Sequence, residues 1–265
     1  MLLNIKEWQK IGWRHNVWEL VRYYHSIRSK PDDWLKNLSS SGSELAKLLQ
    51  ISKDDLEILN SYIQYRKKSL KEGLDLLRTE EEAIAFCKSE GFKWGITKTK
   101  SKDHHQATKT LIATVAGVAQ PICDEYGVSL NPNPSARCIW RVGNLLHVCA
   151  RNLDGAIPDL ADPFVVWEIK EYWGKTGGGS KMSDAVYECQ LVGREIREFE
   201  AKAKIKINHF AFVDGKEQWG SRKSDLLRLI DLTSQGLLDD IFIGADVEKR
   251  FGKVLTETLN KRRSI

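Results

Sequence analysis

Apolar positions recur at helical spacing over roughly the first hundred residues of the chain. They lie three or four residues apart, and Gly and Pro are sparse between them. Ser52 and Thr79 precede two of the apolar runs as helix N-caps, the second with a glutamate three positions on. The Lys-rich stretch 97–103 has almost nothing to bury and predicts a linker. We therefore expect a helical N-terminal domain over residues 1–100 and a second domain over 104–265.

Beyond the linker, runs with helical spacing alternate with short β-prone runs. Gly127 ends a broad apolar helical face, and Gly143-Asn144 separates two β-prone runs as the turn of a hairpin. A serine at position 224 predicts the cap of a later helix. The order is helix, three strands, helix, strand, helix, which is typical of an α/β domain. The predicted helices span 104–126, 184–203 and 224–232, and the predicted strands span 138–142, 145–149, 164–169 and 207–213.

Composition excludes some classes of protein. Hydrophobic residues make up 42% of the chain, but no apolar run reaches the roughly 18 residues that cross a bilayer. The N-terminus lacks the features of a secretory signal, and we expect a cytoplasmic protein without a membrane partner. Five cysteines at irregular spacing fit neither a disulfide framework nor a zinc site, which predicts reduced core residues. A net charge of +5 is compatible with a phosphate-rich partner and does not establish one.

The residues that could carry chemistry lie between positions 158 and 170. Pro158-Asp159 is followed by the apolar strand that contains Glu168-Ile169-Lys170. Glu168 and Lys170 are two positions apart on a strand, so their side chains emerge on the same face. Two converging carboxylates, from Asp159 and Glu168, would bind a hard cation such as Mg²⁺. Lys170 could then orient the attacking water or neutralise charge on a phosphate.

The Pro-Asp and Glu-x-Lys elements, in this order of helices and strands, resemble the PD-(D/E)xK nuclease superfamily. The resemblance covers about residues 104–215 and implies a restriction-endonuclease-like core, which is a mixed central sheet flanked by helices. It implies Asp159 and Glu168 as Mg²⁺ ligands and Lys170 as the catalytic lysine. Glu125 resembles an additional acidic residue of some members, and Gln190 could face the site, although Arg194 stands where a related branch has tyrosine.

The expected function is hydrolysis of double-stranded DNA, by a type II restriction endonuclease acting as a homodimer, because cutting both strands usually needs two active sites. A DNA repair or mobile-element nuclease is the nearest alternative. A catalytically silent DNA-binding or protein-interaction module on the same fold is another. Candidate DNA contacts are basic and polar residues near the proposed site and in a polar loop after the fourth strand. They are Lys175, Lys181, Arg194, Gln218, Arg222 and Lys223.

Two simpler interpretations compete with this one. Glu168 and Lys170 could form an ordinary ion pair on an exposed edge strand, which would contribute little to stability and nothing to chemistry. Asp162, before Pro163, could replace Asp159 as a ligand, but we favour a role in the turn. Asp154, before Gly155, also has the pattern of a turn residue.

Overall fold

A mixed sheet forms the centre of the protein. The computed structural model describes residues 5–27, 33, 44–49, 51–97, 107–174 and 179–263. Within them, four strands pair in the order β3-β4-β5-β6; β3 is antiparallel to β4, and β4, β5 and β6 are parallel. Their bounds are Gly155–Ile157, Val165–Glu171, Asn208–Asp214 and Asp240–Ile243. The sequence predicted β4 and β5 but neither β3 nor β6.

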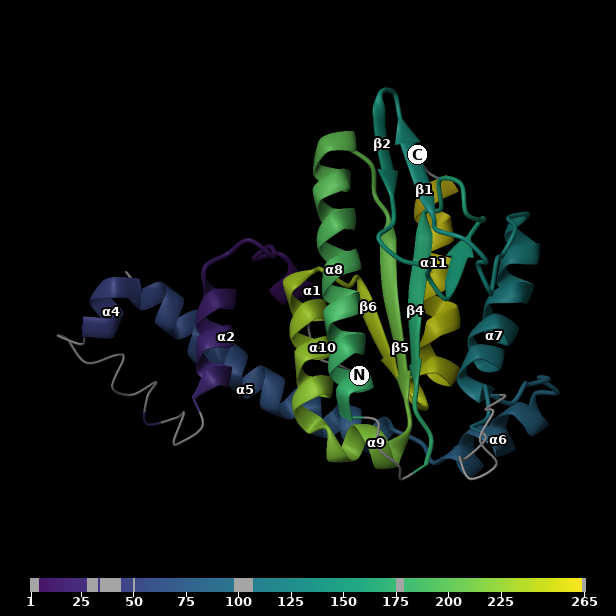
Figure 1. Ribbon diagram of the computed structural model, residues 1–265, viewed down its shortest axis with the longest axis horizontal. Coiled ribbons are helices and arrows are strands. Elements are labelled where there is room, and N and C mark those ends of the chain that lie inside the picture. The colour runs from purple at the N-terminus through teal and green to yellow at the C-terminus, as the bar shows by residue number, and fades with distance from the viewer. Residues whose placement is uncertain are drawn as a thin grey trace.

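Helices cover both faces of this sheet (Figure 1). On one face, α8 (Gly179–Ala203) and α10 (Lys223–Gln235) bury Val186 and Leu229 against Ala211 of β5. On the other face, α7 (Thr110–Tyr126) and α11 (Gly252–Arg263) cover the aromatic side chains of the strands, among them Trp167 and Phe212. A short π-helix, η1 (Val247–Phe251), precedes α11. The fold is therefore α/β, with the sheet between two helical layers, as the sequence predicted.

The predicted hairpin is confirmed as a separate two-stranded sheet. β1 (Ile139–Val142) pairs antiparallel with β2 (Leu145–Val148), and Gly143 in the turn has a φ of 56°. Trp140 anchors the hairpin, because its buried indole Nε1 donates to the carbonyl of Pro163 at 2.7 Å. The hairpin extends beyond the start of β4, at the top of Figure 1.

Most predicted helices are present, with shifted ends. α7 ends at Gly127, which has the predicted left-handed conformation at a φ of 65°. α8 begins before its predicted start, and α10 begins at Lys223, so the predicted cap by Ser224 is wrong. The five cysteines are free and buried, as expected: Cys87, Cys123, Cys138, Cys149 and Cys189. Most of the predicted linker, residues 98–106, lies outside the described residues.

Helices precede the sheet, as predicted, but α5 is a long helix of 24 residues rather than a short one, and Ser52 and Thr79 cap α5 and α6 with complete capping boxes. They are α1 (Ile5–Gln9), α2 (Val17–Ser26), α4 (Glu44–Leu49), α5 (Lys53–Leu76) and α6 (Glu80–Ser89).

A buried carboxylate on α10, Asp231, joins α2 and α5 to the core. It accepts hydrogen bonds from Tyr62 at 2.7 Å and Arg66 at 2.8 Å, and His25 lies 3.0 Å away. None of the described helices combines the length and apolar character needed to cross a membrane.

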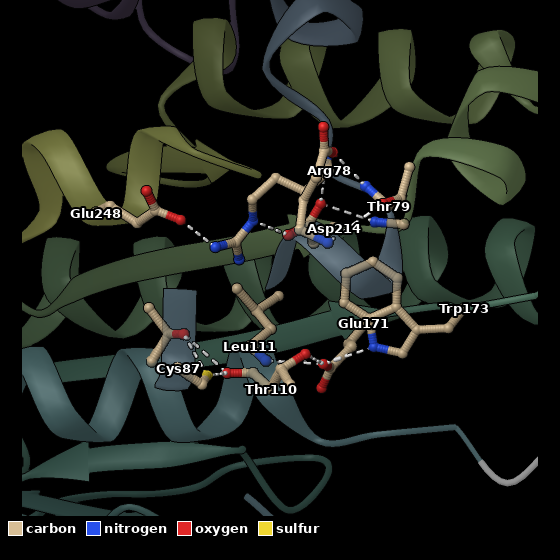
Figure 2. Close-up of polar contacts among 12 residues, drawn as sticks. Arg78, Thr79, Cys87, Thr110, Leu111, Glu171, Trp173, Asp214 and Glu248 are labelled. Atoms are coloured by element: carbon tan, nitrogen blue, oxygen red, sulfur yellow. Dashed lines mark hydrogen bonds and ion pairs between the residues drawn. The ribbon is translucent and has the colours of Figure 1, made fainter. Parts of the chain in front are cut away.

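The carboxyl ends of β4 and β5 are held by two polar clusters (Figure 2). Arg78 lies between α5 and α6; its Nε donates to Asp214 of β5 at 2.7 Å, and its guanidinium also pairs with Glu248. Glu171 of β4 accepts a hydrogen bond from the backbone N–H of Leu111, in the first turn of α7, at 2.7 Å. It also accepts from the indole of Trp173 at 2.8 Å and from the hydroxyl of Thr110 at 3.0 Å. Burial raises the pKa of Glu171 to about 7.

The raised pKa of Glu171 gives a testable pH dependence. Between about pH 4.5 and pH 7 the folded protein binds more protons at this carboxyl than the unfolded chain does, so its contribution to stability is lost as pH rises through 7. We expect Glu171→Gln to match the wild type near pH 5 and to be more stable at pH 8, by on the order of 3 kcal/mol. Urea unfolding at both pH values measures this difference. A variant that is less stable than the wild type at pH 8 would contradict the expectation.

Candidate active site

β4 places Glu168 and Lys170 on the face of the sheet that α8 covers. Alternate residues of the strand point to opposite faces, and Val166 on the same side packs against Val192 and Ile196 of α8. Glu168 is 0% exposed and Lys170 is 5% exposed. The pair therefore lies inside the protein, and an exposed surface ion pair is not what the structure contains.

A third charged side chain, Asp154, faces Glu168 from the residue directly before β3. Gly155 pairs with Trp167 in the antiparallel register of β3 and β4, and continuing that register by one residue sets Asp154 opposite Glu168. The carboxylate of Asp154 is oriented by the backbone N–H of Ile169, which donates to Oδ2 at 2.7 Å. Its other oxygen, Oδ1, has no hydrogen-bond partner among the described residues.

Gly155 is required for this approach of the two strands. The indole of Trp167 lies across it, and a Cβ built on Gly155 would be 1.9 Å from the Trp167 ring. A larger residue would push β3 away from β4 and carry Asp154 with it.

Lys170 joins two carboxylates that come from different elements. Its Nζ donates to Oε2 of Glu168 at 2.6 Å and to Oε2 of Glu188, on α8, at 2.9 Å. Glu188 also pairs with the guanidinium of Arg151, from the segment between β2 and β3. Arg151 Nε lies 3.5 Å from Oε1 of Glu168. The cluster therefore contains three carboxylates and two cations.

α8 also fixes the backbone that carries Arg151. Glu195 lies two helical turns from Glu188 on the same side of the helix. Its Oε1 accepts the backbone N–H of Ala150 at 2.9 Å and the thiol of Cys149 at 3.2 Å. One face of α8 thus orients Lys170 and Arg151 together.

Burial and neighbouring charges set the ionisation of the cluster. Burial raises the pKa of Glu168, more than the ammonium of Lys170 lowers it. Burial alone would lower the pKa of Lys170, but Glu168, Cys189 and Glu188 together outweigh this effect and raise it. Burial alone would likewise raise the pKa of Glu188, but its hydrogen bonds with Arg151 and Lys170 lower it. Lys170 therefore stays protonated at neutral pH.

Two atoms in the cluster lack the hydrogen bonds that buried polar atoms normally make. Glu168 Oε1 and Arg151 Nε are both buried, and neither has a hydrogen-bond partner among the described residues. A carboxylate oxygen in this condition can accept a cation, and a guanidinium N–H can donate to an anion.

The described part of the chain contains no group of three or more His, Cys, Asp and Glu side chains arranged to hold a metal. A cation here would rest on Asp154 and Glu168, which suits Mg²⁺ because it keeps several waters and binds substrate phosphate.

The structure does not bring Asp159 to Glu168. Ile157, the last residue of β3, pairs with Val165, so Asp159 lies past the start of β4. Its Oδ1 accepts a hydrogen bond from the side chain of Asn131. Asp162 has a φ of 50°, and its Oδ1 accepts the backbone N–H of Arg141 at 2.8 Å, which is the geometry of a turn residue.

Glu125 lies apart from this cluster, and Gln190 makes no hydrogen bond or ion pair with it. Glu125 is exposed near the C-terminal end of α7, which covers the opposite face of the sheet from Glu168. Gln190 is half-buried on α8 and makes no hydrogen bond or ion pair among the described residues.

The predicted DNA contacts differ in their surroundings. Lys181, Arg194 and Lys223 are exposed, and Lys175 lies outside the described residues. The predicted polar loop over 218–223 is wrong, because residues 216–221 form α9 (Lys216–Ser221). Gln218 is buried there and donates to the carbonyl of Gly174, and Arg222 is paired with Asp225. Neither of these two side chains is free to reach a groove of DNA in this conformation.

Sequence reasoning missed Asp154, Glu188 and Arg151 as members of the cluster. Asp154-Gly155 has the composition of a turn, and only its pairing with β4 shows that it opens a strand. Glu188 occupies one face of α8 with Glu195, a spacing of seven that indicates a shared polar side of the helix. That spacing was the one signal available in the sequence.

Comparisons with known proteins give one match. The model of a family described as a domain of unknown function (DUF7687) matches residues 77–258, which is more than half of the chain. The matched range includes every residue of the cluster and all four strands of the central sheet. No curated protein and no solved structure matches the chain.

The burial of Lys170 leads to a prediction about stability. Lys170→Met leaves Glu168 in the core without its main cation, which we expect to cost about 3 kcal/mol of unfolding free energy. The cost should grow from pH 5 to pH 8, because a buried carboxyl with a raised pKa destabilises the fold as it ionises. The double variant Lys170→Met/Glu168→Gln should recover most of the loss. Chemical unfolding of the wild type, both single variants and the double variant measures the coupling. A loss below about 1 kcal/mol at both pH values would indicate a weakly coupled pair.

Proposed function

We propose that this chain, which belongs to the DUF7687 family, is a metal-dependent nuclease that hydrolyses phosphodiester bonds of double-stranded DNA. The observation that carries the proposal is the pairing of β3 with β4, which sets Asp154 opposite Glu168 with Lys170 two residues further on. An acidic pair and a lysine on one sheet face are the groups that the PD-(D/E)xK resemblance calls for. The order of α7, an antiparallel strand pair, α8 and a parallel strand supports a restriction-endonuclease-like core.

The metal would be held by Glu168 Oε1, a buried oxygen without a hydrogen-bond partner among the described residues, and by Asp154, whose Oδ2 accepts the backbone N–H of Ile169 and whose Oδ1 is left for a cation. When bound, Mg²⁺ neutralises charge on the phosphate and lowers the pKa of an attacking water. The site residues fit this role in charge and in burial, and Glu168 Oε1 has only the guanidinium of Arg151 beside it, at 3.5 Å and without a hydrogen bond.

The remaining side chains position the substrate and the water. Lys170, protonated and held by Glu168 and Glu188, can donate a hydrogen bond from Nζ to the water or to a phosphate oxygen. Arg151 has a side chain that is 32% exposed, and its Nε–H lies 3.5 Å from Glu168 Oε1 without a hydrogen bond, so it can donate to a phosphate oxygen. Glu188 keeps both cations in place. Neutralising a developing negative charge from two directions is a large part of phosphoryl-transfer catalysis.

Restriction of foreign DNA by a homodimer is the role we propose, because double-strand cutting usually needs two active sites. Repair or mobile-element cleavage would use the same chemistry. In the alternative of a silent module, the cluster would serve only the stability of the fold.

Plasmid cleavage in Mg²⁺ by the wild type and four single variants tests the proposal. We expect Asp154→Asn, Glu168→Gln and Lys170→Met to reduce the rate by at least about a hundredfold. EDTA should abolish cleavage by the wild type. Asp159→Asn should stay within about threefold of the wild type, since a carboxylate remote from the reacting groups has little effect on rate. Thermal melts show which variants remain folded. Asp154→Asn keeps nearly the same side-chain volume, so we expect it to remain folded.

Comparing Asp154→Asn with Asp159→Asn shows which aspartate binds the metal. If Asp159→Asn loses cleavage and Asp154→Asn keeps it, the ligand is Asp159 and the site proposed here is wrong. If folded Asp154→Asn and Glu168→Gln proteins both cut at the wild-type rate, no nuclease operates at this cluster.

A further inference from the structure

A groove with a cavity volume of about 890 Å³ lies at the end of the sheet where the parallel strands begin. Phe164, just before β4, and Asn208, at the start of β5, line it together with residues of α11 and of the hairpin. Lys170 is six positions beyond Phe164 along β4, about 20 Å away in an extended strand. The groove is therefore separate from the candidate active site, and its size suits a small organic ligand.

Almost all the acidic side chains that line the groove already have a cation or a hydrogen-bond donor of the protein beside them. Asp239 pairs with Arg197 at 2.5 Å and with Lys206 at 2.6 Å. Asp240 pairs with Arg250 at 2.5 Å. Among the carboxylates that line the groove, only Glu257 has neither a cation nor a hydrogen-bond donor beside it in the described part of the chain.

Of the six cations that line the groove, Lys206 pairs with Asp239, and the other five have no ion-pair partner among the described residues. These five are Lys6, Arg141, Lys204, Lys261 and Arg262. The guanidinium of Arg262 lies over the ring of Phe164 at 4.2 Å from its centroid. The groove therefore offers an excess of positive charge beside apolar and aromatic surface, which favours an anion that carries a flat apolar group.

Two amide side chains add hydrogen-bond acceptors to the lining. Asn208 uses its Nδ2 to donate to the carbonyl of Phe164 at 3.2 Å, and Gln9 uses its Nε2 to donate to the carbonyl of Thr233 at 2.9 Å. The amide oxygens of both side chains have no partner among the described residues. Such oxygens accept hydrogen bonds from the exocyclic amino groups of nucleobases.

We propose that this groove binds a nucleotide whose base carries an exocyclic amino group, with the phosphate at Lys261 and Arg262. The same chemistry occurs in a free nucleotide and in a single strand of DNA. The proposal does not depend on the nuclease activity, because the two sites share no residue and the groove lies before the start of β4, away from Glu168 and Lys170.

The test uses the full chain in EDTA, so that no divalent cation contributes at the other site. AMP, UMP and inorganic phosphate are titrated by thermal shift, and labelled oligodeoxyadenylate and oligothymidylate by fluorescence anisotropy. Lys261→Glu is the test variant. Lys253→Glu is the matched control, because it makes the same charge reversal at an exposed position of α11 that does not line the groove.

We expect AMP to bind more tightly than UMP, and phosphate to bind more weakly than either. Lys261→Glu should raise the dissociation constant about tenfold, since it replaces an attraction by a repulsion, and Lys253→Glu should change it less than about twofold. Competition of AMP with the oligodeoxyadenylate would assign one groove to both sources. AMP binding without oligonucleotide binding would assign it to free nucleotides, and the reverse would assign it to single-stranded DNA.

Three results would overturn the proposal. The first is the absence of binding by AMP and by the oligodeoxyadenylate up to about 1 mM. The second is an equal loss of affinity in Lys261→Glu and Lys253→Glu, which would indicate nonspecific attraction. The third is phosphate binding as tight as AMP binding, which would show that the base is not recognised.

Discussion

A carboxylate that stays ionised when it is removed from water needs a cation or hydrogen-bond donors beside it, and Glu168 imposes this constraint at the centre of the core. Lys170 compensates it from the same strand, and Arg151 approaches its other oxygen from the segment before β3. Both cations depend on α8, through Glu188 for their side chains and through Glu195 for the backbone beside Arg151. The position of α8, which connects β4 to β5, therefore determines the charge cluster together with the pairing of β3 and β4. An alteration in the position of α8 would change the electrostatics of the site.

The sequence could predict elements whose pattern is local. β4 and β5 are nearly continuous apolar runs, as strands covered on both faces by helices usually are. α7 ends at Gly127, which adopts the left-handed region without the steric cost of a Cβ, and Ser52 and Thr79 each form a capping box with the acidic residue three positions on. Glu168 and Lys170 could be paired from the two-residue repeat of a strand alone. Each of these predictions needs only residues that are neighbours in the chain.

The rest depends on contacts between distant residues. β3 has three residues, too few for a period to show, and its register on β4 decides that Asp154 rather than Asp159 faces Glu168. An Asp-Gly pair has the same composition in a turn and at the start of a strand. Gln218 and its neighbours form a helix because Trp219 is buried in the core, with its indole bonded to the carbonyl of Lys170 at 3.2 Å. The residues on either side of Trp219 are mostly polar, so the sequence pattern did not indicate that it is buried.

The central claim is that Asp154 and Glu168 together hold a divalent cation. Crystals soaked in Mn²⁺, with diffraction measured at a wavelength where manganese scatters anomalously, test it most directly, because the position of the metal is seen without reference to activity. We expect an anomalous peak between the carboxylates of Asp154 and Glu168, within reach of Lys170 and Arg151, and its loss in Asp154→Asn. A peak at Asp159, or a clear map of this cluster without any peak, would contradict the claim.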